Sequence, residues 1–227
     1  MANSSGFDLP IGDQVARRGN FVSRSIARAC LRLGGWRLEG SIPNLPKMVL
    51  IGAPHTSNMD GVVAIGVLTA IGLRSGTIIK QSAFRGVMGP ILRWFGAIPI
   101  DRAKGGGIVT QSIMAFKRAE RLLLLIAPEG TRTRAPEWKR GYWLIAANAE
   151  APILPAAIDY KKKIVTFGPP VTPSDNYEND LAILIDFYGK NCWPRHPGKA
   201  SAPICAALGL TYETGAAGNA AAAAQKT

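Results

Sequence analysis

The sequence is poor in cysteine, histidine and aromatic residues. Its 227 residues include 3 cysteines and 2 histidines, and aromatic side chains make up 7% of the chain. The cysteines, at positions 30, 192 and 205, form no Cys-x-x-Cys pair and no zinc-ligand spacing, so we predict no metal site. An odd and sparse set of cysteines favours a reducing cytoplasm.

The sequence also lacks a long hydrophobic run. A helix that spans a bilayer needs about 20 consecutive apolar residues, and the longest uncharged apolar stretch, residues 61–73, is too short. The first residues, MANSSGFDLPIGDQ, lack the charged and then apolar layout of a signal peptide. We therefore expect a protein that is soluble or peripheral to a membrane rather than integral.

Acidic residues are scarce as well. The chain has 27 lysines and arginines against 15 aspartates and glutamates, a formal net charge of +12. Such a charge favours an anionic partner: nucleic acid, an anionic membrane surface, or an acidic carrier or substrate. The few aromatic residues form no aromatic-and-basic RNA-binding signature, so we predict no nucleic-acid partner.

The length and the order of the expected elements indicate one α/β domain. Apolar segments of strand length alternate with segments of helix length, as in a three-layer domain. We predict a central sheet, mixed or mostly parallel, flanked by helices. We divide the chain into a loose lead-in (residues 1–16), a basic amphipathic helix (17–36), the main domain (37–190) and a C-terminal extension (191–227) whose last part is of low complexity.

The predicted N-terminal helix carries a cationic stripe beside an apolar surface. Arg24, Arg28 and Arg32 recur at four-residue spacing and therefore share one helix face. The apolar residues beside them are Phe21, Ile26, Ala29, Cys30, Leu33 and Trp36. We expect this helix to contact the headgroups of an anionic membrane. The alternative is an ordinary surface helix that packs on the domain.

The stretch IGAPHTSNMDG, residues 51–61, holds a histidine and a carboxylate, His55 and Asp60. A short apolar run precedes it and a longer one follows, which predicts a strand, a loop and a helix. Positions five apart lie on different faces of a helix, so the two side chains meet only if His55 lies in the loop and Asp60 in the first helical turn. Ser57 or Asn58 would cap that turn.

An imidazole beside a carboxylate can act as a general base. Asp60 would accept the proton of one ring nitrogen and leave the other nitrogen of His55 to face a substrate. The alternative is a capping aspartate and a loop histidine without chemistry, because the pattern is short. The second histidine, His196, lies between prolines without a neighbouring acid, and we interpret it as structural or exposed.

Three further stretches end an apolar run in a turn or a charged group. In LLLLIAPEGTRTR, residues 122–134, a run typical of a buried strand opens into a polar loop. A glycine, a hydroxyl and a guanidinium in one loop suit the binding of an anion. The other two stretches are GAIPIDR, residues 96–102, and APILP, residues 151–155.

In this order, the four stretches resemble the sequence blocks of the glycerolipid acyltransferase family, whose best-known members acylate lysophosphatidic acid. The family's first block, Asn-His-x-Ser-x-x-Asp, is matched by His55, Ser57 and Asp60, with Pro54 in the place of the asparagine. The second block, an apolar run with a glycine that ends in arginine, is matched by residues 96–102.

The last two blocks extend the resemblance toward the end of the domain. The third, Phe-Pro-Glu-Gly-Thr-Arg, is matched by residues 128–132, with Ala127 in the place of phenylalanine. The fourth, a proline within an apolar strand, is matched by Pro155. The resemblance covers about residues 36–168, and four blocks in order are a far more specific signal than one.

The resemblance implies a glycerol-3-phosphate acyltransferase-like α/β fold and the transfer of an acyl group from a thioester to a hydroxyl. His55 would be the base, Asp60 its orienting acid, and Ser57 would hold the loop. The implied acceptor-binding residues are Arg102, Glu129, Gly130, Thr131, Arg132 and Lys80. We expect Glu129 to position the guanidinium of this loop or the loop amides, since a carboxylate repels phosphate. Amides at the start of the following helix would contribute to an oxyanion site.

The resemblance also implies the partners. The acceptor would be a lysophospholipid, first of all 1-acylglycerol-3-phosphate, and the donor acyl-CoA or acyl-carrier protein, with no cofactor. We expect a cytoplasmic protein, peripheral on the inner face of the membrane. The alternatives are another acceptor (glycerol-3-phosphate, a lyso-ornithine lipid or another lysolipid) or a non-catalytic protein that binds anionic membranes. A serine hydrolase is excluded, because the sequence has no Gly-x-Ser-x-Gly elbow.

Overall fold

The structure, a computed structural model, describes residues 6–87, 89–90, 96–100 and 107–212. Within them, one sheet has seven strands in the spatial order β1-β7-β6-β2-β5-β3-β4. The strands are β1 (Arg37–Gly40), β2 (Lys47–Ala53), β3 (Ser75–Lys80), β4 (Ala97–Ile100), β5 (Leu122–Ile126), β6 (Ile153–Asp159) and β7 (Ile164–Phe167). Strands β6 and β7 pair antiparallel, and the other neighbours pair parallel. The predicted mixed, mostly parallel sheet is confirmed.

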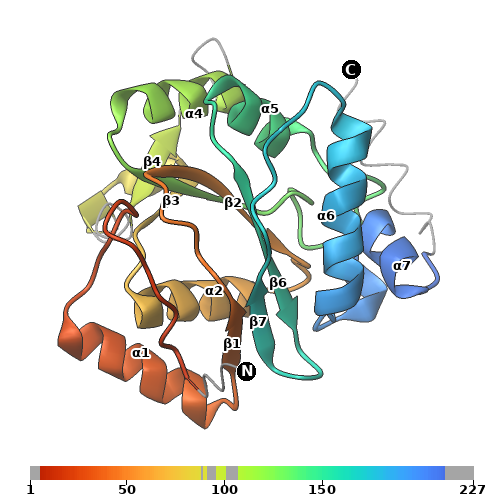
Figure 1. Cartoon of the computed structure of the whole chain (residues 1–227), viewed down its shortest axis with the longest axis horizontal. Helices are drawn as coiled ribbons and strands as arrows, with labels where there is room; N and C mark the ends of the chain where they lie inside the picture. The colour runs from red at the N-terminus through yellow and green to blue at the C-terminus, as the bar shows by residue number, and fades with distance from the viewer. Residues whose placement is uncertain (1–5, 88, 91–95, 101–106, 213–227) are drawn as a thin grey trace.

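Helices cover both faces of this sheet (Figure 1). The helices of the described residues are α1 (Phe21–Leu33), α2 (Asn58–Ile71), α4 (Gly107–Arg118), α5 (Gly141–Asn148), α6 (Tyr177–Asn191) and α7 (Ala202–Leu208), with short 3-10 turns η1 (Gln81–Phe84) and η2 (Pro197–Lys199). The first two pack on one face of the sheet, and α4 to α7 pack on the other. The three-layer α/β fold and its N-terminal helix are therefore present as predicted.

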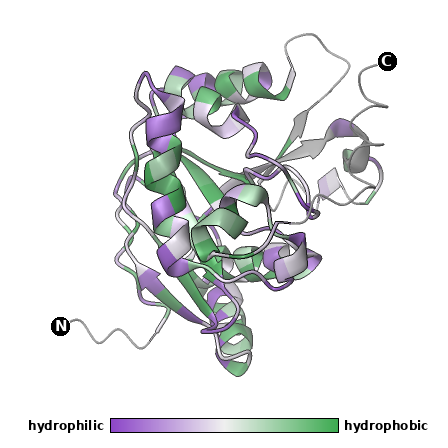
Figure 2. Ribbon diagram, turned by 90° about the vertical axis from the view of Figure 1, so that its right-hand side faces the viewer, coloured by the Kyte–Doolittle hydropathy of each residue, from purple (hydrophilic) through white to green (hydrophobic). Residues whose placement is uncertain are grey.

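The central strand β2 shows why the sheet is buried on both faces. Its side chains alternate: Val49, Ile51 and Ala53 join the core under α4 to α7, whereas Met48 and Leu50 join the core under α1 and α2. All five side chains are buried, which is typical of a strand between two helical layers. Figure 2 shows the hydrophobic residues gathered along the strands in the middle of the molecule.

The carboxyl ends of three neighbouring strands meet at one edge of the sheet. Strand β2 pairs in parallel with β5 on one side and with β6 on the other. The chain therefore leaves β2 through the loop of residues 54–57 beside the place where it leaves β5 through residues 127–132. In open α/β sheets this edge is where ligands bind.

Both ends of the described chain pack more closely than the sequence predicted. Phe7 and Val15, which lie in the predicted loose lead-in, are 2% and 1% exposed and belong to the core beside α1. The described part of the predicted C-terminal extension, residues 191–212, also packs on the domain, because Ile204 and Cys205 of α7 are buried against α6. Apolar side chains spaced too irregularly to form a pattern hold both segments on the domain.

The arginine stripe of α1 does not lie free in solvent as the sequence suggested: Arg24 and Arg28 are half-buried, and only Arg32 is exposed. Arg28 forms an ion pair with Asp8 at 3.0 Å and donates a hydrogen bond to the Ala70 carbonyl at the end of α2. Arg32 lies over the ring of Phe7, 5.8 Å from its centroid. The stripe therefore fastens α1 to α2, and the outer face of the helix is apolar.

That outer face carries Phe21, Val22, Ile26 and Leu33, whose exposure ranges from 59% to 90%. An amphipathic helix with an apolar outer face is unusual for a surface in water, where such residues are normally scattered. In the described part of the chain, no helix combines the length and the apolar character needed to cross a bilayer.

Candidate active site

His55 lies in the loop between β2 and α2, as the sequence analysis expected, and Asp60 lies in the first turn of α2. Ser57 is the N-cap residue of this helix. The Nδ1 atom of His55 is 3.7 Å from Oδ2 of Asp60, an electrostatic contact that is longer than a hydrogen bond. The Asp60 side chain is 2% exposed and that of His55 is 27% exposed, so only the imidazole is open to solvent.

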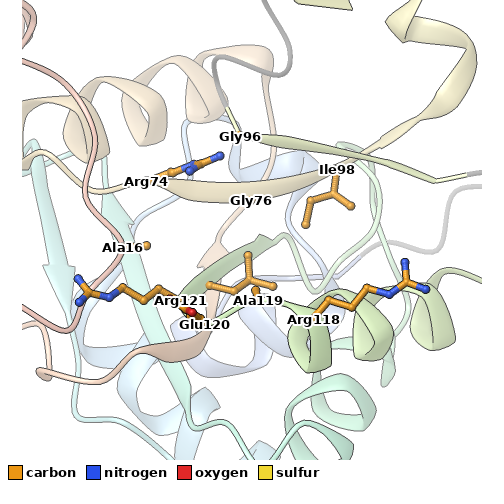
Figure 3. Close-up of a pocket in the computed structure, with 10 residues that line it drawn as sticks. Ala16, Arg74, Gly76, Gly96, Ile98, Arg118, Ala119, Glu120 and Arg121 are labelled. Atoms are coloured by element: carbon orange, nitrogen blue, oxygen red, sulfur yellow. The ribbon is translucent and has the colours of Figure 1, made fainter.

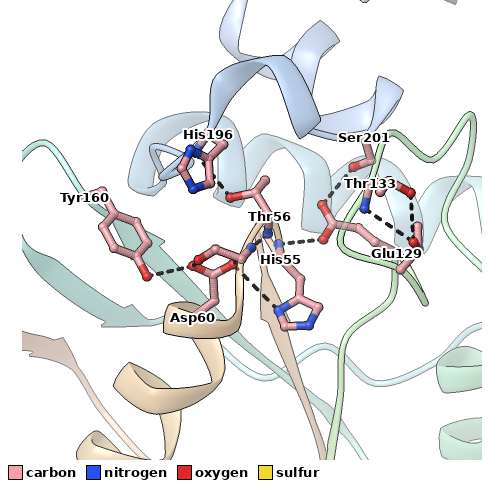
Figure 4. A network of polar contacts seen from close by, with 10 residues as sticks. His55, Thr56, Asp60, Glu129, Thr133, Tyr160, His196 and Ser201 are labelled. Atoms are coloured by element: carbon pink, nitrogen blue, oxygen red, sulfur yellow. Dashed lines mark hydrogen bonds and ion pairs between the residues drawn. The ribbon is translucent and has the colours of Figure 1, made fainter. Parts of the chain in front are cut away.

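Four donated hydrogen bonds hold the carboxylate of Asp60 (Figure 4). Its Oδ2 atom accepts from the backbone N–H groups of Thr56 and Ser57, at 2.6 and 2.7 Å. Its Oδ1 atom accepts from the hydroxyl of Ser57 at 2.8 Å and from the phenol of Tyr160 at 2.6 Å. Because two donors bond to each carboxylate oxygen, the orientation of the Asp60 carboxylate relative to His55 is fixed.

A second buried carboxylate, Glu129, lies behind the same loop. It follows β5 and accepts the backbone N–H of His55 at 2.5 Å, on Oε2. Its Oε1 atom accepts the hydroxyl of Ser201 at 2.9 Å. The side chain is 2% exposed. The loop that carries the imidazole is thus tied to a carboxylate on each side.

Burial changes the proton affinity of both groups. It lowers the pKa of His55 below its ordinary value, and the charge of Arg132 lowers it further against the attraction of Asp60. The ring is therefore neutral at pH 7 and able to accept a proton. Burial raises the pKa of Glu129 to about 7, although the hydrogen bonds from His55 and Ser201 favour its charged form.

Two hollows meet at His55. One is an apolar groove of about 220 Å³ between α2 and the ends of β5 and β6, with walls that include Ala64, Ile65 and Leu125. The other is a more polar and open cleft of about 440 Å³, lined by His55, Ala127, Gly130, Thr131 and Arg132. The site can therefore hold a molecule that has an apolar tail and an anionic head.

Comparison with known proteins agrees with this geometry. Residues 38–159, more than half of the chain, match the model of the acyltransferase family. The protein belongs to this family. No curated protein sequence matches the acyltransferase.

A solved structure shares the fold of the acyltransferase. It is the crystal structure of the 1-acyl-sn-glycerophosphate (LPA) acyltransferase, PlsC, from Thermotoga maritima. The TM-score is 0.54 with 14% sequence identity, over 74% of this chain and 76% of that one. At this identity the likeness establishes the fold.

The structure brings part of the expected site together. Gly130, Thr131 and Arg132 line the open cleft beside His55. The left-handed backbone of Gly130, with φ at 66°, also passes so close to Lys139 that a Cβ atom would lie 2.9 Å from its side chain. A residue with a side chain would therefore be strained where the loop turns, chiefly because of the left-handed backbone.

Other expected residues lie elsewhere. Glu129 does not line the cleft. It was expected to position Arg132 or the amides of its own loop, and it accepts the amide N–H of His55 in the loop before α2. Ser57 also stays outside both hollows, and its hydrogen bonds to Asp60 fit the expected role of holding the loop. Lys80 is the last residue of β3, and its side chain lies outside the described part, as does the whole of Arg102.

The N–H groups of residues 55–57, just before α2, are not free to contribute to an oxyanion site, and the expected contribution of the amides at the helix start itself stays a prediction. The N–H of His55 is donated to Glu129, and those of Thr56 and Ser57 are donated to Asp60. All three point into the protein, because the two carboxylates compete successfully for them. These N–H groups therefore stabilise the conformation of the loop and are not available to a substrate.

Tyr160 and Ser201 complete the bonding of the two carboxylates, and neither was predicted as a site residue from the sequence. Tyr160 follows β6 and lies 100 positions from Asp60 along the chain. Ser201 precedes α7 and lies 72 positions from Glu129. No spacing rule links residues so far apart, and only the pairing of β2 with β6 and the packing of the C-terminal segment bring them to the site.

A larger hollow of about 750 Å³ lies at the opposite edge of the sheet, where β3 and β5 begin (Figure 3). Arg74, Arg118 and Arg121 surround it, but their guanidinium groups point in different directions. Arg121 donates a hydrogen bond to the Asp13 carbonyl at 2.6 Å. This hollow lacks the convergent polar groups of a binding site, so its size alone assigns it no role in the acyltransferase.

Proposed function

We propose that this acyltransferase moves a fatty acyl group from an acyl thioester to the hydroxyl of a lysophospholipid, with 1-acylglycerol-3-phosphate as the acceptor and phosphatidic acid as the product. The observation that carries the proposal is the place of His55, which lines the apolar groove and the cleft that contains Arg132. A base at this junction suits a reaction between an acyl chain and a hydroxyl that is linked to an anionic head.

The reaction follows from the position of the imidazole. Neutral His55 takes the proton of the acceptor hydroxyl while the oxygen attacks the thioester carbonyl. The tetrahedral intermediate then expels the thiolate, which receives the proton from the imidazolium. Asp60 orients the ring and stabilises its positive charge. Acid–base assistance of this kind is worth about 10²–10⁴-fold in rate.

The two hollows suit the two parts of the substrates. The groove between α2 and the sheet has room for apolar chain beside the reacting carbon. The cleft offers the guanidinium of Arg132 and the hydroxyl of Thr131 to a phosphate. Arg102 and Lys80 stay part of the proposed acceptor site by family resemblance. The donor is acyl-CoA or acyl-carrier protein, and both are acidic enough to suit the basic chain.

We further propose that the protein works as a peripheral protein on an anionic membrane. The outer face of α1 is apolar, and α2 exposes Met59, Val62 and Ile65 along one stripe. Ile65 also lines the groove beside His55. If this surface lies in the interfacial region of a bilayer, a lysolipid can reach the site without entering water.

The test is the transfer of labelled acyl groups to a panel of lysolipids. Acyl-CoA and acyl-carrier protein would be offered as donors, with lysophosphatidic acid, glycerol-3-phosphate and a lyso-ornithine lipid as acceptors. Wild type, His55→Ala and His196→Ala would be compared. His196 is the matched control, since its hydrogen bond to Thr56 is donated by the backbone N–H and survives the substitution.

We expect transfer to lysophosphatidic acid that falls at least 10²-fold in His55→Ala and stays within about twofold in His196→Ala. Transfer to another acceptor would keep the mechanism and change the substrate. If no acceptor is acylated while both variants bind anionic vesicles as the wild type does, the protein is a membrane-binding relative without chemistry.

A further inference from the structure

We propose that the C-terminal segment of residues 192–201 is a working part of the active site, in which Ser201 is a positioning residue that acts on His55 through Glu129. This inference rests on the proposed function and extends it. The segment lies wholly outside the part of the chain that matches the family model, residues 38–159. The acyltransferase blocks therefore do not contain all of the groups that shape the catalytic loop.

A chain of hydrogen bonds leads from the segment to the loop. Trp138 Nε1 donates to Ser201 Oγ at 3.1 Å, and Ser201 Oγ donates to Glu129 Oε1 at 2.9 Å. Glu129 Oε2 then accepts the N–H of His55. An indole N–H can only donate, so the one hydroxyl proton of Ser201 is directed at the carboxylate.

The two central residues of this chain are closed to solvent. Ser201 and Glu129 are 1% and 2% exposed, so water cannot replace the hydroxyl if it is removed by substitution. When a buried carboxylate loses a hydrogen-bond donor, the desolvation of its charge is no longer offset by that bond. The orientation of Glu129, and with it the backbone of His55, therefore depends on the Ser201 side chain.

Backbone hydrogen bonds fix the segment at both of its ends. At the first end, the Trp193 N–H donates to the Ile158 carbonyl at 3.1 Å, and the Trp193 carbonyl accepts from Tyr160 at 3.0 Å. At the other end, the Ala202 N–H donates to the Ala135 carbonyl at 2.8 Å. These hydrogen bonds to β6, to the residue after it and to the loop after β5 hold Ser201 beside Glu129.

The segment touches the catalytic loop on a second side. The His196 N–H donates to Thr56 Oγ1 at 3.3 Å, and the N–H of Thr56 is one of the donors to Asp60. The loop is therefore gripped on both sides of His55, through Glu129 and through Thr56 (Figure 4).

The charges around Glu129 explain why a single hydroxyl matters. Within the described structure, the titratable groups that face it from other elements are Asp60, Tyr188, Cys192 and Cys205. None of them is a cation, so no ion pair offsets the burial that raises the pKa of Glu129 to about 7. Donated hydrogen bonds are what favour its charged form.

The amide of residue 55 gives a direct readout of this arrangement. Because it donates to Glu129, its NMR chemical shift should follow the ionisation of that carboxylate between pH 5 and 9. The titration would be recorded in the His55→Ala background, which keeps the amide and removes the imidazole. We expect Ser201→Ala to move the midpoint upward by about one pH unit, as expected for a lost bond to a charged group.

Two further variants make the titration specific. Ser201→Thr keeps the hydroxyl and should restore the midpoint. Ser174→Ala is the matched control, since the Ser174 hydroxyl donates at 2.9 Å to another buried carboxylate, Asp180, and its loss should leave the amide of residue 55 unchanged. If Ser201→Ala does not fold, Ser201→Cys keeps the shape with a weaker donor and should move the midpoint in the same direction.

Kinetics supply the second readout, with the imidazole present. We expect Ser201→Ala to lower kcat about tenfold with an unchanged KM for both substrates, because the substrates do not touch Ser201 and only the base is displaced. Ser201→Thr should recover most of the rate. An equal loss in Ser174→Ala would show a general effect of stability and would overturn the proposal.

The outcome for this proposal can be separated from the outcome for the function. If the wild type transfers no acyl group, the proposed function fails, and the amide titration still decides whether Ser201 controls Glu129. Suppose instead that the wild type is active. If the pH midpoint for the amide of residue 55 is then the same in His55→Ala with and without Ser201→Ala, the positioning role is wrong.

Discussion

Two buried carboxylates flank the loop of His55, and they are held in different ways. Asp60, in front of the imidazole, accepts three hydrogen bonds from Thr56 and Ser57, which directly precede its helix, and one from Tyr160. Glu129, behind the loop, accepts its two hydrogen bonds from residues far away in the sequence.

The difference separates what a short motif can specify from what the fold must supply. A helix start with an acid at its third position has local donors, because that side chain reaches back to the backbone N–H of the N-cap residue. A carboxylate at the end of a strand has no such local donors. Glu129 therefore depends on β2 for one donor and on the C-terminal segment for the other.

The largest effect is expected from Asp60→Asn. The amide keeps the shape but cannot accept all four donated hydrogen bonds, and it no longer stabilises the imidazolium of His55. We expect kcat/KM for acyl transfer to fall about 10³-fold, within the range for the orienting acid of a catalytic triad. Steady-state kinetics on the purified protein would measure it. A loss below tenfold would mean that Asp60 serves only to cap α2.

Glu129→Gln should change how stability depends on pH. The folded-state pKa of Glu129, about 7, lies above its ordinary value of 4.5. The protonated carboxyl therefore stabilises the folded state fully below pH 4.5, and this contribution is lost as the pH rises through 7. Relative to Glu129→Gln, the free energy of unfolding of the wild type should drop by about 3 kcal/mol between pH 4 and pH 8. Urea unfolding at both pH values measures the difference, and a pH-independent difference would contradict the buried charge.

The same substitution should reduce activity less than Asp60→Asn does. Glutamine still accepts the N–H of His55, but through a neutral oxygen, and the loss of a charge-assisted hydrogen bond corresponds to about a tenfold change in rate. The measurement is kcat at pH 8, where the wild-type carboxylate is charged. If Glu129→Gln lowered the activity as much as Asp60→Asn does, the two carboxylates would contribute equally to the function of His55.

The front of the loop could be predicted from the sequence, and the back could not. The apolar run, the capping serine and the acid at the helix start lie within residues 48–60, so local rules place His55 and Asp60 correctly. The parallel sheet follows in the same way from apolar runs such as residues 122–126. These features depend on neighbours in the chain.

The features that the sequence did not predict depend on distant contacts. Arg28 matches a membrane-facing stripe by spacing, yet Asp8 and the end of α2 turn it inward. Ser201 precedes α7 and caps it with no side-chain hydrogen bond, and its contact with Glu129 arises only because the C-terminal segment packs against the loop after β5. Long-range packing decides both cases, and helical periodicity carries no information about it.

The smallest expected effect belongs to the one distant donor of Asp60. Tyr160→Phe removes one of four hydrogen bonds and keeps the ring, which packs edge-on against Trp36 at 5.2 Å. Because the three donors from Thr56 and Ser57 remain, we expect kcat to fall only about threefold to fivefold, the cost of about 1 kcal/mol for one hydrogen bond.

Tyr142→Phe, which removes a buried hydroxyl on the opposite face of the sheet, is the control for Tyr160→Phe and should leave kcat unchanged. A hundredfold loss in Tyr160→Phe would erase the contrast between the two carboxylates. Asp60 would then depend on the fold as much as Glu129 does, and the local donors of the helix start would not be sufficient to hold the orienting acid.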